Sequence, residues 1–358
     1  MTKVLVGMSG GIDSSVAAYM LKQQGFDVCG VTMTVWKQGK YTADKAKNSC
    51  FSPDKSKDIE KINEICGKIG IRNTVLDISD LYESVVLDNF RSEYLSGHTP
   101  NPCVWCNQKI KFGAMVETAR SAGIDFDYFA TGHYARIEKT GTRYALARAA
   151  DETKDQSYFL YRLNQRQLSS TLFPLGCFTK KEIREIDAQL GFHDVDQTES
   201  QDFYGGHYKD LLDVNPKPGD IVDTDGKVLG HHEGMWNYTI GQRKGLGIAA
   251  PYPLYVVALD PEKNTVTVGY EDKTFNSSVG ASNIVWGAVE EIQGTIRAKA
   301  KIRSTGQPAD CTVHIDSNDR LCAVFDQGIK AATKGQSLVV YKDNIILCGG
   351  IIDRVDGE

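Results

Sequence analysis

Two stretches of this 358-residue sequence combine residue types that could carry out chemistry. The first covers residues 6–15 and reads VGMSGGIDSS, directly after the apolar run Lys3 to Val6. The run predicts a short buried strand, and apolar residues at helical spacing predict a helix from Ser14 to Gln24. A glycine turn between a strand and a helix directs backbone N–H groups and the positive end of the helix dipole at one point. Such a point stabilises an anion, for example a phosphate.

The second stretch covers residues 99–107 and reads TPNPCVWCN. Its two prolines predict a stiff loop that keeps the cysteines out of regular structure. A Cys-x-x-Cys pair can hold a metal, form a disulfide, or lower the pKa of one thiol so that the reactive thiolate forms. Lys109 and Lys111 nearby favour a thiolate. A structural zinc site would need two further ligands, and the sequence has neither a second Cys-x-x-Cys nor a close Cys/His pair with finger-like spacing.

The glycine turn differs from the commoner nucleotide-binding loops. A Walker loop would place Gly-Lys-Ser/Thr after the glycines, and a dinucleotide fingerprint would contain a third glycine. The turn resembles instead the Ser-Gly-Gly-x-Asp-Ser pyrophosphate loop (PP-loop) of enzymes that split ATP between its α- and β-phosphates. The alternative is an ordinary strand-to-helix turn of an α/β domain.

The composition and length of the chain limit the classes of protein to which it can belong. The chain is 41% hydrophobic and 24% charged, which is ordinary for a globular protein, and its length leaves room for two or three domains. Nine cysteines without a regular framework favour a reducing cytoplasm. No apolar run approaches the ~20 residues that span a membrane, and we expect no signal peptide and no membrane partner. A net charge of −5 argues against a protein that coats nucleic acid, but local basic patches can still bind RNA.

The elements that must position these stretches alternate up to about residue 190. Strands are predicted at 3–6, 28–33, 73–78 and 128–130, and helices at 14–24, 59–69, 81–95, 111–122, 156–163 and 180–190; residues 34–52 are predicted to form a loop. This alternation predicts a doubly wound parallel sheet of the α/β class, which binds its ligand at the carboxyl ends of the strands. The turn at Gly7 to Ser14, Met33, and Thr131 to His133 all fall at that edge.

The second half of the chain has a different pattern. Residues 135–149 predict a hairpin, and helical periodicity fades near residue 200. Alternating segments at 295–302, 311–315, 321–325, 337–341 and 345–348 predict a small antiparallel barrel. We therefore expect a PP-loop catalytic domain at residues 1–205, a small mixed or β linker domain at 206–275 and a C-terminal β-barrel that binds tRNA at 276–358.

Ordered motifs make one family resemblance specific. They read GMSGGIDSS at 7–15, TPNPCVWCNQKIKF at 99–112, ATGHY at 130–134, KDQSYFL at 154–160 and TIGQRKGLG at 239–247. These motifs resemble those of the bacterial tRNA-specific 2-thiouridylase (MnmA/TrmU) family, with a weaker match beyond residue 247. The resemblance implies thiolation at C2 of the wobble uridine of tRNA. ATP would adenylylate the uridine oxygen, and a persulfide sulfur would then displace AMP.

The resemblance also implies site residues and partners. ATP phosphates would contact Gly7, Met8, Ser9, Gly10, Gly11, Ile12, Asp13 and Ser14, the adenosine would contact Met33 and Gly132, and Asp13 would help to place Mg²⁺. The tRNA would contact Asn101, Pro102, Cys103, Lys154, Asp155, Gln156, Arg303 and Ser304. The implied partners are the anticodon arm of tRNA and a sulfur-donor protein, such as a cysteine desulfurase or a sulfur relay protein.

The chain departs from the family pattern at the second catalytic cysteine. Cys106 matches the first, but the run Ser200 to Phe203 leads into Tyr204 where the family has its second, and Cys103 stands where many members have aspartate. Our hypothesis is that Cys103 substitutes, so that persulfide transfer and disulfide resolution both occur within residues 103–106. One alternative is an iron–sulfur cluster on Cys103, Cys106 and a third ligand such as Cys50. Another is that thiolation is lost and tRNA binding remains.

Other features have two interpretations. His133 could orient a phosphate or be structural, and a run of alternating cations could face RNA phosphates or solvent: Arg297, Lys299, Lys301 and Arg303. Lys180, Lys181 and Arg184 are typical of a solvated helix face. Five cysteines in apolar patterns are expected to be buried and inert: Cys66, Cys177, Cys311, Cys322 and Cys348. Two other functions stay open, an amide-forming PP-loop ligase that needs no cysteine and a tRNA-binding protein without catalysis.

Overall fold

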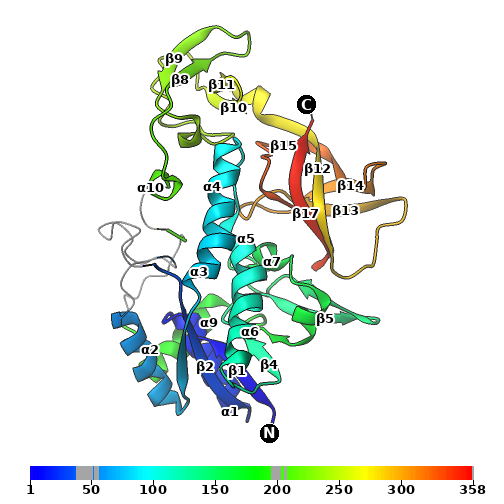
Figure 1. Cartoon of the computed structure of the whole chain (residues 1–358). Coiled ribbons are helices and arrows are strands. Elements are labelled where there is room, and N and C mark those ends of the chain that lie inside the picture. The colour runs from blue at the N-terminus through cyan, green and yellow to red at the C-terminus, as the bar shows by residue number, and fades with distance from the viewer. Residues whose placement is uncertain (38–50, 52–55, 195–202, 205–207, 357–358) are drawn as a thin grey trace.

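The described strands form three sheets that occupy different parts of the molecule (Figure 1). The structure is a computed structural model that describes residues 1–37, 51, 56–194, 203–204 and 208–356. In Figure 1 a parallel sheet lies at the bottom, a four-stranded sheet at the top and a barrel at the upper right. A continuous helical segment, residues 79–95, ends in α4 (Asp88–Leu95) and rises from the first region toward the second. The loop predicted at residues 34–52 falls mostly outside the described residues.

The parallel sheet has the strand order β3-β2-β1-β4-β7, and every pairing in it is parallel. Its strands are β1 (Lys3–Gly7), β2 (Asp27–Thr34), β3 (Asn73–Asp77), β4 (Tyr128–Ala130) and β7 (Thr171–Leu172). Val4 and Val6 pack in one core with residues of the helices at 12–23 and 56–69, whereas Leu5 packs in another core with residues from 110–119. Both faces are therefore covered, which confirms the predicted doubly wound sheet.

The helices around this sheet follow the predicted periodicity with local differences. They are α1 (Ile12–Gln23), α2 (Ser56–Ile69), α3 (Ser79–Tyr82), α4 (Asp88–Leu95), α5 (Pro102–Trp105), α6 (Met115–Ser121), α7 (Ser157–Leu160), α8 (Gln165–Ser169), α9 (Lys180–Leu190) and α10 (Lys209–Leu212). π-Helical segments η2 (Glu83–Leu87) and η3 (Cys106–Ala114) interrupt two of the predicted helices. The prediction that prolines keep the cysteines out of regular structure is wrong. Pro102 stands at the first turn of α5, where its fixed φ favours a helix start.

The remaining strands build the small sheet and the barrel. The small sheet has the order β10-β11-β8-β9. Its strands are β8 (Gly219–Val222), β9 (Val228–His232), β10 (Tyr255–Asp260) and β11 (Thr265–Gly269). Two short 3₁₀ helices lie near it, η4 (Met235–Asn237) and η5 (Glu271–Thr274). The barrel has the order β12-β15-β14-β13-β16-β17 and closes through β12 and β17. Its strands are β12 (Phe275–Trp286), β13 (Thr295–Lys301), β14 (Ala309–Ile315), β15 (Leu321–Lys330), β16 (Ser337–Lys342) and β17 (Ile345–Val355). The predicted antiparallel barrel is confirmed.

The predicted hairpin joins the barrel to the parallel-sheet region. It consists of β5 (Arg136–Thr140) and β6 (Arg143–Ala147), and Ala147 pairs with Ile345 of β17. A buried tyrosine adds a second link, because the Tyr158 hydroxyl donates to the Ser337 carbonyl and accepts from the Ser337 N–H, both at 3.1 Å. The barrel is thus docked on the segment that follows the hairpin.

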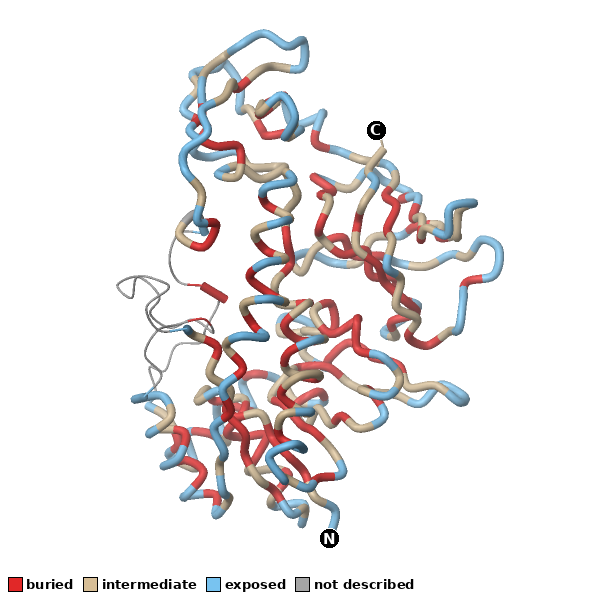
Figure 2. Tube along the Cα trace, viewed as in Figure 1, coloured by how far each residue is buried: buried red, intermediate tan, exposed pale blue. Residues whose placement is uncertain are grey.

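Buried residues follow the strands of the parallel sheet and of the barrel (Figure 2), and the five cysteines expected to be buried follow this pattern only in part. Cys66, Cys311 and Cys348 are buried as predicted, and burial raises the pKa of Cys66 to about 11. The prediction is wrong for Cys177, which is exposed, and Cys322 is only partly buried. Over the described part of the chain, none of the helices combines the length and the apolar character that crossing a bilayer demands.

Candidate active site

The turn between β1 and α1 is folded on its own hydroxyl groups. The Ser14 hydroxyl donates to the Gly11 carbonyl at 3.0 Å and accepts from the Ser9 N–H at 3.2 Å. The Ser9 and Ser14 hydroxyl oxygens also lie 3.2 Å apart. Gly11 precedes α1 without a side-chain cap, so the first N–H groups of this helix keep their capacity to bind an anion.

The neighbouring strands complete this edge of the sheet. Met8 is held by two contacts from β2, because its N–H donates to the Val31 carbonyl at 2.8 Å and its carbonyl accepts from the Thr32 hydroxyl at 3.2 Å. Gly132, just after β4, lies so close to the turn that a Cβ there would be 2.6 Å from the carbonyl carbon of Asp13. Met33 lies on the other neighbouring strand, β2. The residues expected to hold ATP therefore lie on three adjacent strands and their following turns.

Asp13 has two partners that the sequence did not reveal. The Lys180 ammonium lies 2.7 Å from Asp13 Oδ1, and the Tyr134 hydroxyl donates to the same oxygen at 2.9 Å. Lys180 is only 7% exposed, so its assignment to a solvated helix face is wrong, whereas Lys181 is exposed as expected. Thr179 and Glu182 form a capping box, which places Lys180 in the first turn of α9, where it is directed toward α1.

The cysteine-bearing segment is anchored by the barrel. The Thr99 N–H donates to the Lys334 carbonyl at 2.9 Å, and the Gln336 amide donates to the Thr99 and Pro100 carbonyls, both at 3.1 Å. Pro102 then begins α5, so that Cys103 and Cys106 are three residues apart on consecutive helical turns and share one side. The C-terminal barrel therefore fixes the entry to the segment that holds both thiols.

The two thiols differ in exposure. Cys103 is partly exposed, whereas Cys106 is 8% exposed and belongs to the main core. Cys103 packs against the same core, and so does Met33 from the end of β2. The segment thus adjoins the edge of the sheet at which the glycine turn lies.

Tyr204 occupies the position at which the resemblance predicts a second cysteine. Its ring is 3% exposed and packs 6.2 Å from the ring of Phe51, which in turn stacks on Tyr82 at 5.5 Å. Burial, and the charge of Asp210 to a smaller degree, raise the pKa of the Tyr204 hydroxyl. A buried phenol cannot carry sulfur, so Tyr204 serves as part of an aromatic core.

Metal ligands are limited in the described residues. Within residues 1–37, 51, 56–194, 203–204 and 208–356, no group of three or more His, Cys, Asp and Glu side chains is placed to hold an ion. Cys50, the suggested third ligand of a cluster with Cys103 and Cys106, lies outside the described residues. Ser200 to Asp202 lie outside them as well.

His133 sits among aromatic rings beside the sheet edge. Its Nδ1 lies 2.7 Å from the Thr131 hydroxyl, and its ring lies 6.0 Å from that of Phe112 and 6.3 Å from that of Phe173. Burial, followed by the charge of Lys111, lowers the pKa of His133 well below its ordinary value. The ring is therefore neutral at neutral pH, and its contacts are those of a packed side chain.

Two of the three segments expected to contact tRNA, residues 154–156 and 303–304, come together near the barrel. Asp155 accepts from the N–H groups of Ala149 and Ser157, and Gln156 accepts from the N–H of Tyr134 at 2.8 Å. Both side chains therefore hold their own segment in place. Arg148 connects this segment to the barrel, because it lies 3.5 Å from Asp155 and donates to Gln307 at 3.3 Å.

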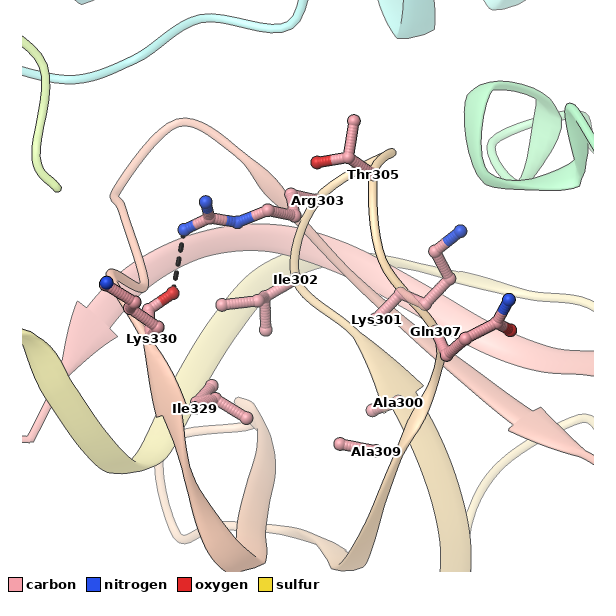
Figure 3. A pocket seen from close by; sticks show the side chains of 9 residues that line it. All are labelled: Ala300, Lys301, Ile302, Arg303, Thr305, Gln307, Ala309, Ile329 and Lys330. Atoms are coloured by element: carbon pink, nitrogen blue, oxygen red, sulfur yellow. Dashed lines mark hydrogen bonds between the residues drawn. The ribbon is translucent and has the colours of Figure 1, made fainter. Parts of the chain in front are cut away.

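Gln307 lines a pocket of about 140 Å³ at one end of β13 (Figure 3). The lining also includes Lys301, Arg303, Thr305 and Lys330, together with the apolar side chains of Ala300, Ile302, Ala309 and Ile329. Lys301 Nζ donates to the Ser304 carbonyl at 3.0 Å, and Arg303 donates to the carbonyls of Lys330 and Ala331. Of the two barrel residues expected to contact tRNA, Arg303 lines this pocket and Ser304 adjoins it.

The alternating cations of β13 and of the residues directly after it are of two kinds. Arg297 pairs with Asp326 at 2.5 Å, and Lys299 lies 3.7 Å from Asp310, both on the exposed surface. Lys301 and Arg303 form no ion pair with a carboxylate of the described residues, and burial lowers the pKa of both. The positive charges of Lys301 and Arg303 are therefore not offset by a described carboxylate at contact distance. This leaves the pocket suited to an anion.

Comparison with known proteins places the chain in a family. Models of three domains match it, described as the tRNA methyl transferase HUP domain at residues 2–204, the tRNA methyl transferase PRC-barrel domain at 211–270 and the aminomethyltransferase beta-barrel domain at 276–352. Among solved structures, a 4-thiouridine synthetase–RNA complex with bound ATP is 16% identical, with a TM-score of 0.35, over 59% of this chain and 46% of that chain. This likeness is too weak to support an argument about function.

Full-length relatives are much closer. The tRNA-specific 2-thiouridylase MnmA of Endomicrobium trichonymphae is 44% identical over 98% of both chains. The proteins of that name from Clostridium perfringens and Caldanaerobacter subterraneus are 41% and 42% identical over 99% and 98% of this chain, and over the same shares of their own. With this identity along its whole length, the chain belongs to the MnmA family of tRNA-specific 2-thiouridylases, which are tRNA sulfurtransferases.

Proposed function

We propose that this protein uses ATP to transfer sulfur to C2 of the wobble uridine of tRNA. The observation that carries the proposal is that a turn suited to phosphate and a pair of thiols adjoin each other. A phosphate-binding turn ends β1, and a helical pair of thiols packs against the core that also holds Met33 at the end of β2. The turn suits ATP, and the thiols suit a sulfur nucleophile.

The first step would activate the base. The uridine O2 attacks the α-phosphorus of ATP, pyrophosphate leaves, and C2 then carries AMP, which leaves far more readily than an oxide. Asp13 fits the Mg²⁺ that this reaction needs. Lys180 and Tyr134 both contact Oδ1, and among the described residues Oδ2 takes no such contact. When bound, the ion offsets the negative charge of the departing pyrophosphate.

The second step would use the two thiols. A persulfide on Cys103 attacks C2 through its terminal sulfur, and AMP leaves. The Cys106 thiolate then attacks the Cys103 sulfur, which releases 2-thiouridine and leaves a Cys103–Cys106 disulfide that an external thiol reduces. Exposure supports this order, because the partly exposed Cys103 can receive sulfur from a donor protein, whereas the buried Cys106 needs only to reach its neighbour.

The three parts of the chain would divide the work. We propose that residues 1–205 carry out the chemistry, and that residues 206–275 and 276–358 clamp the anticodon arm while the wobble base is splayed into the active site. The base must leave its stack because C2 lies within the ring and cannot be reached in a stacked loop. The contacts of Thr99 and Pro100 with Gln336 would link the clamp to the thiols.

Thiolation in vitro tests this function. The protein is incubated with tRNA, ATP, Mg²⁺ and a small persulfide donor, and 2-thiouridine and pyrophosphate are both measured. We expect both products to depend on tRNA. Pyrophosphate release that tRNA does not stimulate would indicate an amide-forming ligase. A gel shift with tRNA but no ATP consumption would indicate a binding protein without catalysis.

The cluster alternative is decided by metal content. The described residues provide Cys103 and Cys106 but not a complete ligand set for a cluster. Iron and acid-labile sulfide are measured in protein purified without oxygen, beside its thiolation activity. Iron with activity that a chelator abolishes would assign the two cysteines to a cluster. Activity without iron, dependent on a persulfide donor, would support direct thiol chemistry.

The barrel pocket gives a prediction about tRNA affinity. The Lys301→Met/Arg303→Gln double variant removes one buried and one partly buried charge from the pocket. We expect the Kd for tRNA to rise about tenfold, and the slope of log K against log salt to fall by about 1–2. Filter binding at several salt concentrations measures both quantities.

Arg297→Ala is the matched control, because this arginine is exposed on the same strand but is already paired with Asp326. We expect its tRNA affinity to change less than about twofold. Equal effects of the control and the double variant would remove the pocket from the tRNA-binding surface and attribute binding to overall charge.

A further inference from the structure

A buried histidine touches the backbone of the phosphate-binding turn. His193 Nε2 lies 3.0 Å from the Gly10 carbonyl oxygen, and Nδ1 lies 2.8 Å from Asp187 Oδ1. The side chains of His193 and Asp187 are 0% and 5% exposed. The turn and the histidine are 183 residues apart in sequence. Such a contact, sealed from water, retains more of its strength than one on the surface.

Gly10 and Asp187, the two hydrogen-bonding neighbours of the His193 ring, fix its orientation. The Gly10 carbonyl can only accept, so Nε2 must carry a hydrogen and donate it. On the other side of the ring, Nδ1 faces the Asp187 carboxylate at 2.8 Å. Because both ring nitrogens are held by a neighbour, the ring keeps Nε2 directed at the Gly10 carbonyl.

The local fold holds the ring in this position. α9 ends at Gly191, whose N–H donates to the Asp187 carbonyl and whose carbonyl accepts from Lys68 at 2.9 Å. Phe192 is buried, and its ring lies 6.2 Å from that of Tyr19 on α1. The chain therefore leaves α9 along a fixed path, which places His193 against the turn.

The contact between His193 and the Gly10 carbonyl orients a backbone N–H that would bind phosphate. Gly10 has a φ of 84°, a conformation that glycine adopts readily. Its carbonyl belongs to the same planar peptide unit as the Gly11 N–H, and in a trans peptide these two groups point in opposite directions. A carbonyl fixed toward the buried His193 therefore directs the Gly11 N–H away from the core, toward the side on which a phosphate would lie.

We infer that His193, supported by Asp187, is a positioning residue that sets the orientation of the Gly10–Gly11 peptide for ATP binding. Both ends of α9 then hold the turn. Lys180 at the start of the helix contacts Asp13, and His193, just after its end, contacts Gly10. This inference rests on the proposed function, since it assumes that the turn binds ATP. His193 does not touch the nucleotide, and it acts only through the backbone of Gly10.

Two amide substitutions separate the two contacts of the ring. Glutamine places its amide nitrogen near the Nε2 position and can still donate to Gly10, whereas asparagine places its nitrogen near the Nδ1 position and reaches only Asp187. We expect His193→Gln to bind ATP within about threefold of the wild-type Kd, and His193→Asn to bind about tenfold more weakly. At saturating ATP, kcat and the affinity for tRNA should be unchanged in both variants.

ATP affinity is measured directly by calorimetry, with thermal unfolding as the check on folding. Unaltered ATP binding by folded His193→Asn, or an equal loss in both variants, would overturn the inference. If His193→Asn does not fold, the Nε2 proton of His193 is followed by NMR in the wild-type protein. This resonance should shift when ATP binds, and a resonance that stays unchanged at saturation would overturn the inference too. A wild-type protein that does not bind ATP would instead refute the proposed function.

Discussion

Cys106→Ser protein is expected to make no detectable 2-thiouridine while it still releases pyrophosphate from ATP in the presence of tRNA. Serine nearly matches the volume of cysteine at this buried position, so the core should be retained. Its hydroxyl, however, neither forms a thiolate nor attacks a disulfide or persulfide sulfur at neutral pH. The loss of thiolation should be at least about 10³-fold, measured by nucleoside mass spectrometry beside a pyrophosphate assay.

Cys66→Ala is the matched control for this experiment. Cys66 is buried in α2, and burial raises its pKa to about 11, so it contributes packing and no reactive thiolate. Its replacement should leave thiolation within about twofold. Cys103→Ser is the companion variant. If it retained full activity, both the persulfide hypothesis and the cluster alternative would be wrong, because each needs the Cys103 sulfur.

Gly132→Ala should weaken ATP binding strongly through a backbone clash. The added Cβ would lie 2.6 Å from the Asp13 carbonyl carbon and 2.7 Å from the Ser14 nitrogen, well inside contact distance. These are backbone atoms of α1 and cannot move aside as a side-chain end could, so the start of the helix must shift. We expect an ATP affinity about 100-fold weaker and a free energy of unfolding lower by about 1–3 kcal/mol. Calorimetry and denaturant unfolding measure the two effects.

Gly67→Ala provides the contrast for this variant. Gly67 is an exposed helical glycine in α2, and a Cβ there would have no neighbour within 4 Å. Alanine should stabilise the helix by about 0.5–1 kcal/mol and leave ATP binding unaltered. If Gly132→Ala bound ATP like the wild-type protein, the turn next to Asp13 would not be the nucleotide site.

The sequence predicted the fold class because its periodicities are local. The apolar run Lys3 to Val6, the glycine turn and the helix after it specify one strand–turn–helix unit from neighbouring residues alone. Repetition of such units predicted the parallel sheet, and period-two alternation after residue 279 predicted the barrel. The same local pattern was misleading at Pro102, where two prolines suggested an open loop and one of them begins a helix.

The candidate site was predictable only as far as its motifs extend. The turn at residues 7–14 and the thiol pair at 103 and 106 are recognisable from residue types and spacing. Lys180 was not, because a lysine beside two other cations in an amphipathic helix is ordinarily solvated, and only the packing of α9 on α1 buries it beside Asp13. His193 carried no signal at all in the sequence.

By itself the sequence determined the kinds of element, their order along the chain and the chemical groups at the ends of the strands. The tertiary structure alone decided which distant groups meet. It brought Lys180 to Asp13, His193 to Gly10 and Gln336 to the loop before the thiols, across 167, 183 and 237 residues. It also placed Arg297 and Lys299 in surface ion pairs and Lys301 and Arg303 beside a pocket. The reason is that periodicity reports on neighbours along one helix or strand, whereas these contacts depend on how separate elements pack.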